Sequence, residues 1–360
     1  MLDILPSAKL EPLSRVSPSR FTSLQLCPLR EIWAANNKPR LLPLHPAAQL
    51  GTALHKFIEL GMCGKIRNEQ DMISCWETAC GTVEQEMQNN SLEKHLVPLS
   101  LSANNYEVKK IMAFNIVRDF FNNGLRADKT DKSKKQESEV WLQTNDGKIG
   151  GIIDLIKHTQ KGIVITDYKT GSIIDSLSEH GIIKQEYQQQ LKFYAALYFT
   201  VYGVWPVSLT IEGLDKQEYD IPFSKEECLG LLQDATKLMD ELNELIGSGL
   251  SCEDFARPSA RTCSFCLYRP ACKRYWEQKS SSDEWPADIC GRIKEKKILG
   301  NGLFRIVVEN GESTIAIRGL SLERHNFLSG EVNNVMFCNL GHDATHGFFV
   351  EKQLTTGYQL

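Results

Sequence analysis

Apolar and polar positions form their most regular pattern between residues 150 and 171, where two short apolar runs flank a polar segment that ends in glycine. The first run covers residues 152–156 and the second covers residues 163–165. Short apolar runs on both sides of such a loop are typical of a β-hairpin. The stretch 139–143 alternates enough to predict a further strand that leads into this hairpin.

The register of the hairpin decides which polar side chains meet. If His158 pairs with Ile163 across a four-residue loop, Asp154 lies directly opposite Asp167. Directly opposite residues share one face of the sheet, with Cβ atoms about 4.5–5.5 Å apart. A one-residue slip would turn Asp154 to the other face, so this inference depends on the turn.

A lysine joins the same face. Asp167 and Lys169 are two residues apart on one strand, so their side chains point the same way and Tyr168 points to the other face. The pattern therefore predicts two carboxylates and an ammonium group at one end of an apolar hairpin, close enough for the carboxylates to share a hard cation. A surface hairpin with solvated polar ends is the alternative interpretation.

Helical periodicity covers much of the chain up to residue 247. Helices are predicted from Ser17 or Ser19 to Leu26, from Gly51 or Thr52 onward, over most of 68–125, over 182–201 and over 225–247. A second strand pair is predicted over 207–214 and 217–223. The proline-rich stretch 36–48 predicts a loop, and the charged stretch 126–135 predicts an exposed connector.

Two polar pairs lie one helical turn apart on these predicted helices. His55 and Glu59 are separated by four residues, as are Gln190 and Tyr194, so each pair shares a helix face. A core histidine beside a solvated glutamate, and a tyrosine that only packs, are the structural interpretations of these pairs.

The composition changes after residue 285, where short strand-like runs alternate with Gly, Asn and Ser turns up to residue 360. An all-β unit of this size fits a small barrel of the oligonucleotide-binding (OB-like) type. Arg292, Lys294 and Lys296 would alternate onto one strand face, where they could follow phosphates or simply form a solvated edge. We predict a separable module that binds nucleic acid or a partner protein, so that a chain ending near Gln278 stays folded.

Composition and charge set wide bounds on function. The 360 residues can form one large core or two domains, and the net charge of −4 neither requires nor excludes nucleic acid. No apolar run reaches about 18 residues and the first residues do not resemble a signal peptide, so we expect a cytoplasmic protein without a membrane partner. No P-loop motif occurs, which excludes the usual ATP-driven motor.

Eleven cysteines in an apparently cytosolic chain favour metal ligation or buried thiols over disulfides. Cys263, Cys266 and Cys272 form a C-x2-C-x5-C group, but zinc sites and iron–sulfur clusters both use four ligands. The fourth ligand is missing locally. Cys27 is the favoured candidate, because its neighbours predict a helix end packed on the core, and Cys252, which lies in an acidic stretch, is the runner-up. Cys75 and Cys80 have no ligand spacing and are expected to be core thiols.

Together these signals resemble the PD-(D/E)XK nuclease superfamily, and most closely its RecB-like and CRISPR-adaptation-type branch with a four-cysteine iron–sulfur cluster. The resemblance covers roughly residues 17–276 and rests on the order of its motifs. These are G-x3-H at 51–55, Asp154, D-Y-K at 167–169, Gln190-x3-Tyr194 and the cysteines. It implies a restriction-endonuclease-like α/β core, a central mixed sheet flanked by helices, over residues 1–280. The OB-like unit predicted at 285–360 lies outside the resemblance.

The resemblance also implies roles for individual residues. His55, Asp154, Asp167 and the backbone carbonyl of Tyr168 would bind Mg²⁺ or Mn²⁺. Lys169 would position the attacking water and help to deprotonate it. Gln190 and Tyr194 would orient the site, and Cys27, Cys263, Cys266 and Cys272 would hold a 4Fe–4S cluster. Asp167 stands where many members have glutamate, which is a permitted variant.

The predicted function is a metal-dependent DNA nuclease, with exonuclease action on single-stranded or end-containing DNA in repair, recombination or defence against mobile elements. DNA is the expected partner, and a helicase or a defence-system protein is a further possible partner. The alternatives are a non-catalytic nucleic-acid-binding subunit of a helicase–nuclease complex and a zinc-stapled scaffold.

Overall fold

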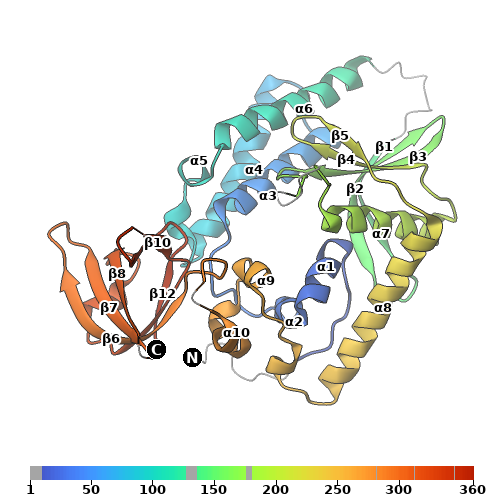
Figure 1. Cartoon of the computed structure of the whole chain (residues 1–360). Helices are drawn as coiled ribbons and strands as arrows, with labels where there is room; N and C mark the ends of the chain where they lie inside the picture. Colours follow the sequence, from blue (N-terminus) through green and yellow to red (C-terminus); the bar gives the residue numbers. More distant parts are fainter. Residues whose placement is uncertain (1–9, 127–135, 176–180, 281, 312, 344) are drawn as a thin grey trace. The chain divides into compact units, whose positions relative to one another are not determined.

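A computed structural model describes residues 10–126, 136–175, 181–280, 282–311, 313–343 and 345–360 (Figure 1). The charged connector predicted at 126–135 lies almost entirely outside these residues. The chain forms two compact units. The first unit comprises Pro12–Gln25 and Pro46–Ser248; the second comprises Leu26–His45 and Gly249–Leu360, together with the residues up to Glu11.

The first unit is built on a five-stranded sheet in the order β1-β2-β3-β4-β5. The strands are β1 (Gln136–Gln143), β2 (Gly150–Thr159), β3 (Gly162–Lys169), β4 (Ser208–Gly213) and β5 (Glu218–Asp220). Only β3 and β4 pair in parallel, and the other neighbours are antiparallel. The predicted central mixed sheet is therefore confirmed.

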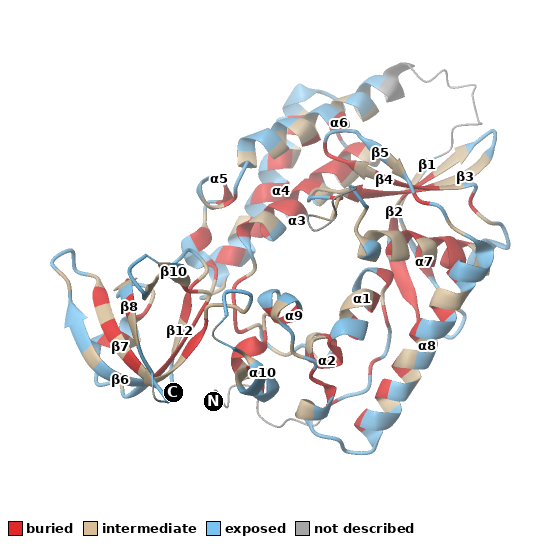
Figure 2. Cartoon of the chain, viewed as in Figure 1, coloured by how far each residue is buried: buried red, intermediate tan, exposed pale blue. Residues whose placement is uncertain are grey.

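Helices flank this sheet (Figure 1). They are α1 (Pro18–Leu26), α3 (Pro46–Met62), α4 (Glu69–Asn89), α5 (Leu99–Ser102), α6 (Tyr106–Arg126), α7 (Gln185–Tyr202) and α8 (Lys225–Gly247), with a 3₁₀ turn at Lys94–Leu96. Helix α7 packs on β1 to β4 and on α8, whereas α3 packs on α4, α6 and β1. Figure 2 shows the buried faces of these helices and of the central strands in red. This is the predicted mixed α/β architecture.

Local sequence explains most helix boundaries. Ser224 caps α8 by accepting a hydrogen bond from the Glu227 amide, and Gly203 ends α7 with a φ of 70° that favours glycine. Helix α3 begins at Pro46, five residues before the predicted start at Gly51. A proline is tolerated in the first turn of a helix because its missing N–H would have no intrahelical partner there.

The second unit contains short helices and one seven-stranded sheet. The helices are α2 (Pro28–Ala35), α9 (Ala260–Ser264) and α10 (Lys273–Gln278), with 3₁₀ turns at Cys252–Phe255, Arg269–Ala271 and Asn326–Ser329. The strands are β6 (Ile289–Ile298), β7 (Phe304–Asn310), β8 (Ser313–Leu320), β9 (Asn334–Cys338), β10 (Gly341–Asp343), β11 (Phe348–Val350) and β12 (Thr356–Gln359). Their order is β10-β11-β8-β7-β6-β9-β12. The C-terminal strands are present as predicted, but seven strands exceed the five of an OB barrel.

The basic run on β6 does not share one face. A bulge lies between Ile293 and Glu295, so Lys294 has no partner in the ladder with β7. Arg292 is paired with Glu309, whereas Lys296 is paired with the fully buried Ile306. Residues 306 and 309 of β7 are three apart and point to opposite faces, so Arg292 and Lys296 also lie on opposite faces. Lys296 donates to the carbonyls of Leu328 and Gly330, at 2.9 and 2.6 Å. The predicted alternation of residues 292, 294 and 296 onto one face is therefore wrong.

A buried arginine connects the cysteine segment to the C-terminal sheet inside the second unit. Arg269 is 2% exposed and makes two hydrogen bonds to the Asp288 carboxylate, at 2.7 and 3.2 Å. It also donates to the Cys266 carbonyl at 3.2 Å. Asp288 accepts further bonds from the Tyr275 hydroxyl and the Asn339 amide. A chain ending near Gln278 would lack Asp288, so we no longer expect it to keep the cysteine segment folded.

Asp288→Asn should destabilise the protein by about 3–5 kcal/mol, because it leaves the buried Arg269 guanidinium without a counter-charge. Denaturant unfolding of the full chain measures the change. Asp283→Asn is the matched control, since the Asp283 side chain is 88% exposed and its loss should cost at most about 0.5 kcal/mol. Equal stability of the two variants would contradict the proposed importance of the buried pair.

Candidate functional site

The hairpin that carries the acidic residues has the predicted register. His158 pairs with Ile163, and the ladder continues by one further pair, Thr159 with Gly162. The connecting loop therefore has two residues instead of four, and Gly162 takes a φ of 131° that favours glycine. The ladder ends at Leu155 opposite Thr166, so the next positions, Asp154 and Asp167, face each other where regular pairing stops.

Asp154 lies at this interruption. Its Oδ2 atom accepts a hydrogen bond from the backbone amide of Tyr168, at 2.8 Å. The Tyr168 side chain is buried on the other side, against Glu212 and Phe120, as the strand alternation predicts. Burial, and next the charge of Asp167, raise the pKa of Asp154 to about 8, and the Tyr168 amide opposes this shift.

Asp167 is the centre of the polar contacts. It is 2% exposed, and its Oδ1 atom accepts a hydrogen bond from Gln190 Nε2 at 3.0 Å. Its Oδ2 atom lies 2.7 Å from Lys169 Nζ. That contact is an ion pair without good hydrogen-bond geometry, so Oδ2 is a buried acceptor that receives no hydrogen bond. Such an acceptor can take part in binding a cation.

Helix α7 brings two predicted side chains to this point. Gln190 accepts from Lys169 Nζ at 2.9 Å and donates from Nε2 to the Tyr194 hydroxyl at 3.0 Å as well as to Asp167. Burial and the charge of Asp167 raise the pKa of Tyr194, so its hydroxyl stays protonated. One amide therefore links the lysine, a carboxylate and the tyrosine, as expected for residues one helical turn apart.

Helix α3 contributes His55. Burial, and then the positive charge of Lys169, lower the pKa of His55, while Asp167 acts in the opposite direction. The helix passes close to the end of β3, because a Cβ atom added to Gly51 would lie 3.1 Å from Thr170 Oγ1. Glu59, the other polar residue on this face, instead forms an ion pair with Lys56 at 2.7 Å.

Two further side chains lie near the site, and the sequence patterns did not indicate a role for either. The Tyr187 ring lies 4.5 Å from Lys169 Nζ, which is a cation–π distance. Its position three residues before Gln190 on a helix is the signal that could have indicated it. The second neighbour is Glu139, which has a φ of 54°. It lies opposite Asp154 at a position where β1 and β2 are not paired, and its charge helps to raise the pKa of Asp154.

The four cysteines of the predicted cluster come together in the second unit. Cys27, Cys263, Cys266 and Cys272 all line one small cavity and are at most 9% exposed. Burial raises the pKa of Cys266 and Cys272 to about 12, and the negative charge of the other thiolates adds to the increase. Cys252 is partly exposed and does not line this cavity, so Cys27 is the fourth cysteine there.

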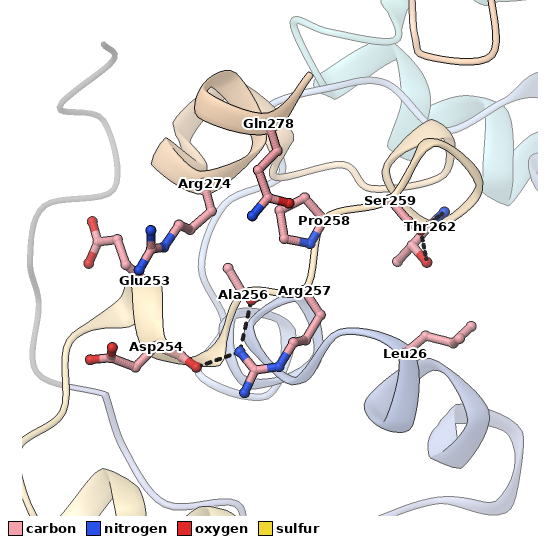
Figure 3. Close-up of a pocket in the computed structure, with 10 residues that line it drawn as sticks. All are labelled: Leu26, Glu253, Asp254, Ala256, Arg257, Pro258, Ser259, Thr262, Arg274 and Gln278. Carbon is pink, nitrogen blue, oxygen red and sulfur yellow. Dashed lines mark hydrogen bonds between the residues drawn. The ribbon is translucent and has the colours of Figure 1, made fainter. Parts of the chain in front are cut away.

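Cys27 and Cys272 directly precede α2 and α10, and Cys263 lies within α9. Arg257, Pro258 and Thr262 line both the cysteine cavity and an open groove of about 730 Å³ on the same unit (Figure 3). Arg257 is held in place because its Nη1 atom donates to the carbonyls of Asp254 and Ala256, at 2.6 and 2.9 Å. The cysteine cavity and the groove therefore share part of their lining, which includes an arginine held by two hydrogen bonds.

The side chains are not arranged around a single ion. Among the described residues, no three His, Cys, Asp or Glu side chains are grouped so that they could hold one metal ion. At the hairpin, Lys169 already contacts the free oxygen of Asp167. No helix in the described part of the chain has both the length and the apolar character needed to cross a bilayer.

The comparison with protein families gives one match. The profile of the PD-(D/E)XK nuclease superfamily matches residues 15–273, which include the whole hairpin site and all four cysteines. No curated protein matches this sequence.

Proposed function

Because the chain belongs to the PD-(D/E)XK nuclease superfamily, we propose that it is a Mg²⁺- or Mn²⁺-dependent deoxyribonuclease that uses Asp154, Asp167 and Lys169. The observation that carries this proposal is the contact of the buried Asp167 with both Lys169 and Gln190, next to a second carboxylate. Members of this superfamily typically cleave nucleic acid with a divalent metal ion. The choice of DNA and of these two metals is our inference.

The donor atoms are of the kind that suits a divalent cation, although the described side chains are not grouped closely around one point. Two neighbouring carboxylates in a buried place repel each other, which contributes to the raised pKa of Asp154, and Asp167 Oδ2 receives no hydrogen bond. Hard oxygen ligands suit Mg²⁺, and the imidazole of His55 adds a preference for Mn²⁺. We assign His55, Asp154, Asp167 and the backbone carbonyl of Tyr168 as ligands. A bound cation would neutralise charge on the phosphate and lower the pKa of a bound water.

Lys169 would position the attacking water and donate to the phosphate. Its ammonium group is held by Gln190 Oε1 and by the Tyr187 ring, so few orientations remain open to it. Gln190 would keep Asp167 and Lys169 in fixed relation, and Tyr194 would orient Gln190. Positioning of this kind converts binding energy into rate because the reacting groups need no further ordering.

Cys27, Cys263, Cys266 and Cys272 would bind a 4Fe–4S cluster. Four buried thiols around one cavity support this proposal, since a cluster holds its thiolates farther apart than one metal ion does. Burial raises the pKa of the Cys263 thiol, and the charges of Arg269 and Arg30 oppose this increase in part, which helps the thiolate that a cluster requires. A zinc-stapled scaffold would use the same cysteines and remains the alternative that metal analysis distinguishes.

The finer assignment is a RecB-like exonuclease on single-stranded or end-containing DNA, acting in the cytoplasm in repair, recombination or defence, with a helicase or a defence-system protein as partner. The motif order supports this branch. Retention of Asp154, Asp167 and Lys169 together disfavours the non-catalytic subunit, because a chain that had lost cleavage would not need all three.

A cleavage assay of the full chain tests the proposal. Labelled single- and double-stranded DNA, with free or blocked ends, is incubated with Mg²⁺, with Mn²⁺ or with a chelator. We expect cleavage with either metal, none with the chelator, and resistance of circular DNA. No cleavage of any substrate with either metal would favour the DNA-binding subunit, and cleavage of circular DNA would replace the exonuclease by an endonuclease.

A further inference from the structure

An aromatic-lined cavity of about 1000 Å³ lies on the second unit, beside the C-terminal sheet. Its walls include Trp276, Trp285, His342 and Phe349, together with Lys279. Pockets of this size that combine aromatic walls with a few polar groups are typical ligand sites. The cavity uses none of the residues assigned to cleavage or to the cysteine cluster.

Four of the lining residues carry flat rings. His342, in β10, stacks on Phe349, in β11, with ring centroids 4.8 Å apart and planes 22° from parallel. Trp285 is partly exposed, and its ring centroid lies 6.0 Å from that of Tyr275. Tyr275 is fully buried, so Trp285 rests against a ring of the core. Aromatic rings supported in this way form platforms on which unpaired nucleobases stack.

The charges around the cavity favour an anionic chain. Asp288 is neutralised by Arg269, whereas the Asp283 side chain is 88% exposed to solvent and lies 3.4 Å from the His342 ring. Lys279 forms no salt bridge within the described part of the chain; burial lowers its pKa, and the charge of Asp288 acts on it in the opposite direction. The carboxylate that acts on Lys279 is already paired with Arg269, so a phosphate beside this partly buried lysine would improve the charge balance.

We infer that this cavity binds an unpaired base of single-stranded nucleic acid, with Lys279 on a neighbouring phosphate. The identity of the ligand rests on the proposed nuclease function, whereas the cavity itself does not. A phosphate chain fits better than a peptide, because the aromatic faces and the unpaired lysine together match a base and its phosphate. Binding here would hold the strand on the second unit independently of cleavage.

Binding of labelled oligothymidylate to the full chain, in the presence of a chelator, tests the inference without cleavage. His342→Leu and Trp285→Leu should each weaken binding about 5- to 100-fold, the effect of losing one stacking contact. His346→Leu is the matched control. His346 stacks on Phe348 in the same hairpin at 5.6 Å, but does not line the cavity, so its loss should change affinity less than about twofold.

Three comparisons complete the test. Trp285→Phe should restore most of the affinity, which separates stacking from loss of fold. Lys279→Gln should reduce the dependence of affinity on salt, whereas Lys273→Gln should not, because Lys273 is paired with Glu277. An abasic strand of equal length should bind the wild type as weakly as oligothymidylate binds His342→Leu.

Equal affinity of the wild type for abasic and base-bearing strands would overturn the inference, as would unchanged binding by both leucine variants. Cleavage is measured separately with Mg²⁺ or Mn²⁺. If the wild type cleaves DNA but the leucine variants bind oligothymidylate with unchanged affinity, the cavity is not a nucleic-acid site and the proposed nuclease function still holds. If the wild type never cleaves DNA but the leucine variants lose affinity, the cavity is a nucleic-acid site and the proposed nuclease function is wrong.

Discussion

Asp167→Asn is expected to reduce metal-dependent DNA cleavage at least about 1000-fold, which corresponds to about 4 kcal/mol of lost transition-state stabilisation. The carboxylate contacts Lys169 and accepts a hydrogen bond from Gln190. Its negative charge would therefore stabilise both the lysine and the proposed cation. The amide keeps the size of the side chain and an oxygen that can accept from Gln190. The loss should therefore appear in the rate with Mg²⁺ or Mn²⁺ and not in the fold.

Asp220→Asn is the control for this substitution, because Asp220 is exposed and lies in the outer strand β5. It should cleave within about twofold of the wild-type rate. Without metal, Asp167→Asn should stay folded: it removes one partner of Lys169, but Asp154 still acts on that lysine and the repulsion between the two buried carboxylates is gone. Wild-type cleavage by Asp167→Asn would show that the hairpin is not the catalytic site.

Cys27→Ser is expected to remove the brown colour, the iron and the sulfide of the anaerobically purified protein and to lower its soluble yield. Ligation by four thiolates is coupled to folding, and structural metal sites of this kind contribute about 10 kcal/mol or more. Cys27 comes from a segment far from the other three cysteines in the sequence, so its loss also releases α2 from them. Iron, zinc and sulfide analysis with visible absorbance measures the outcome.

Cys75→Ser is the matched control, since Cys75 is partly exposed and lies outside the cavity. Cys338 is less suitable, because it is fully buried and a polar replacement would destabilise the protein by itself. If Cys27→Ser keeps full iron and sulfide while Cys252→Ser loses them, Cys252 is the ligand. A colourless wild type with one bound zinc would favour the scaffold instead.

The register of the hairpin could be predicted from sequence because a local pattern determines it. Alternation of apolar residues and a short polar loop specify that His158 meets Ile163, and every other pair follows from that one. The bounds of α8 follow in the same way from a serine cap and continuous periodicity. Motif spacing likewise indicated His55 and Gln190, whose helices bring them to the hairpin.

Tertiary structure decided the features that depend on residues distant in the chain. The sequence favoured Cys27 over Cys252 as the fourth cysteine, from its predicted place at a helix end and from the family resemblance, but only packing brings Cys27 to the cavity. The bulge at Lys294 breaks the alternation on β6, and no local signal marks it, because it depends on how β6 pairs with β7. Asp288 is the partner of Arg269 for the same reason: their contact is made by folding of the sheet against the cysteine segment and not by spacing along the chain.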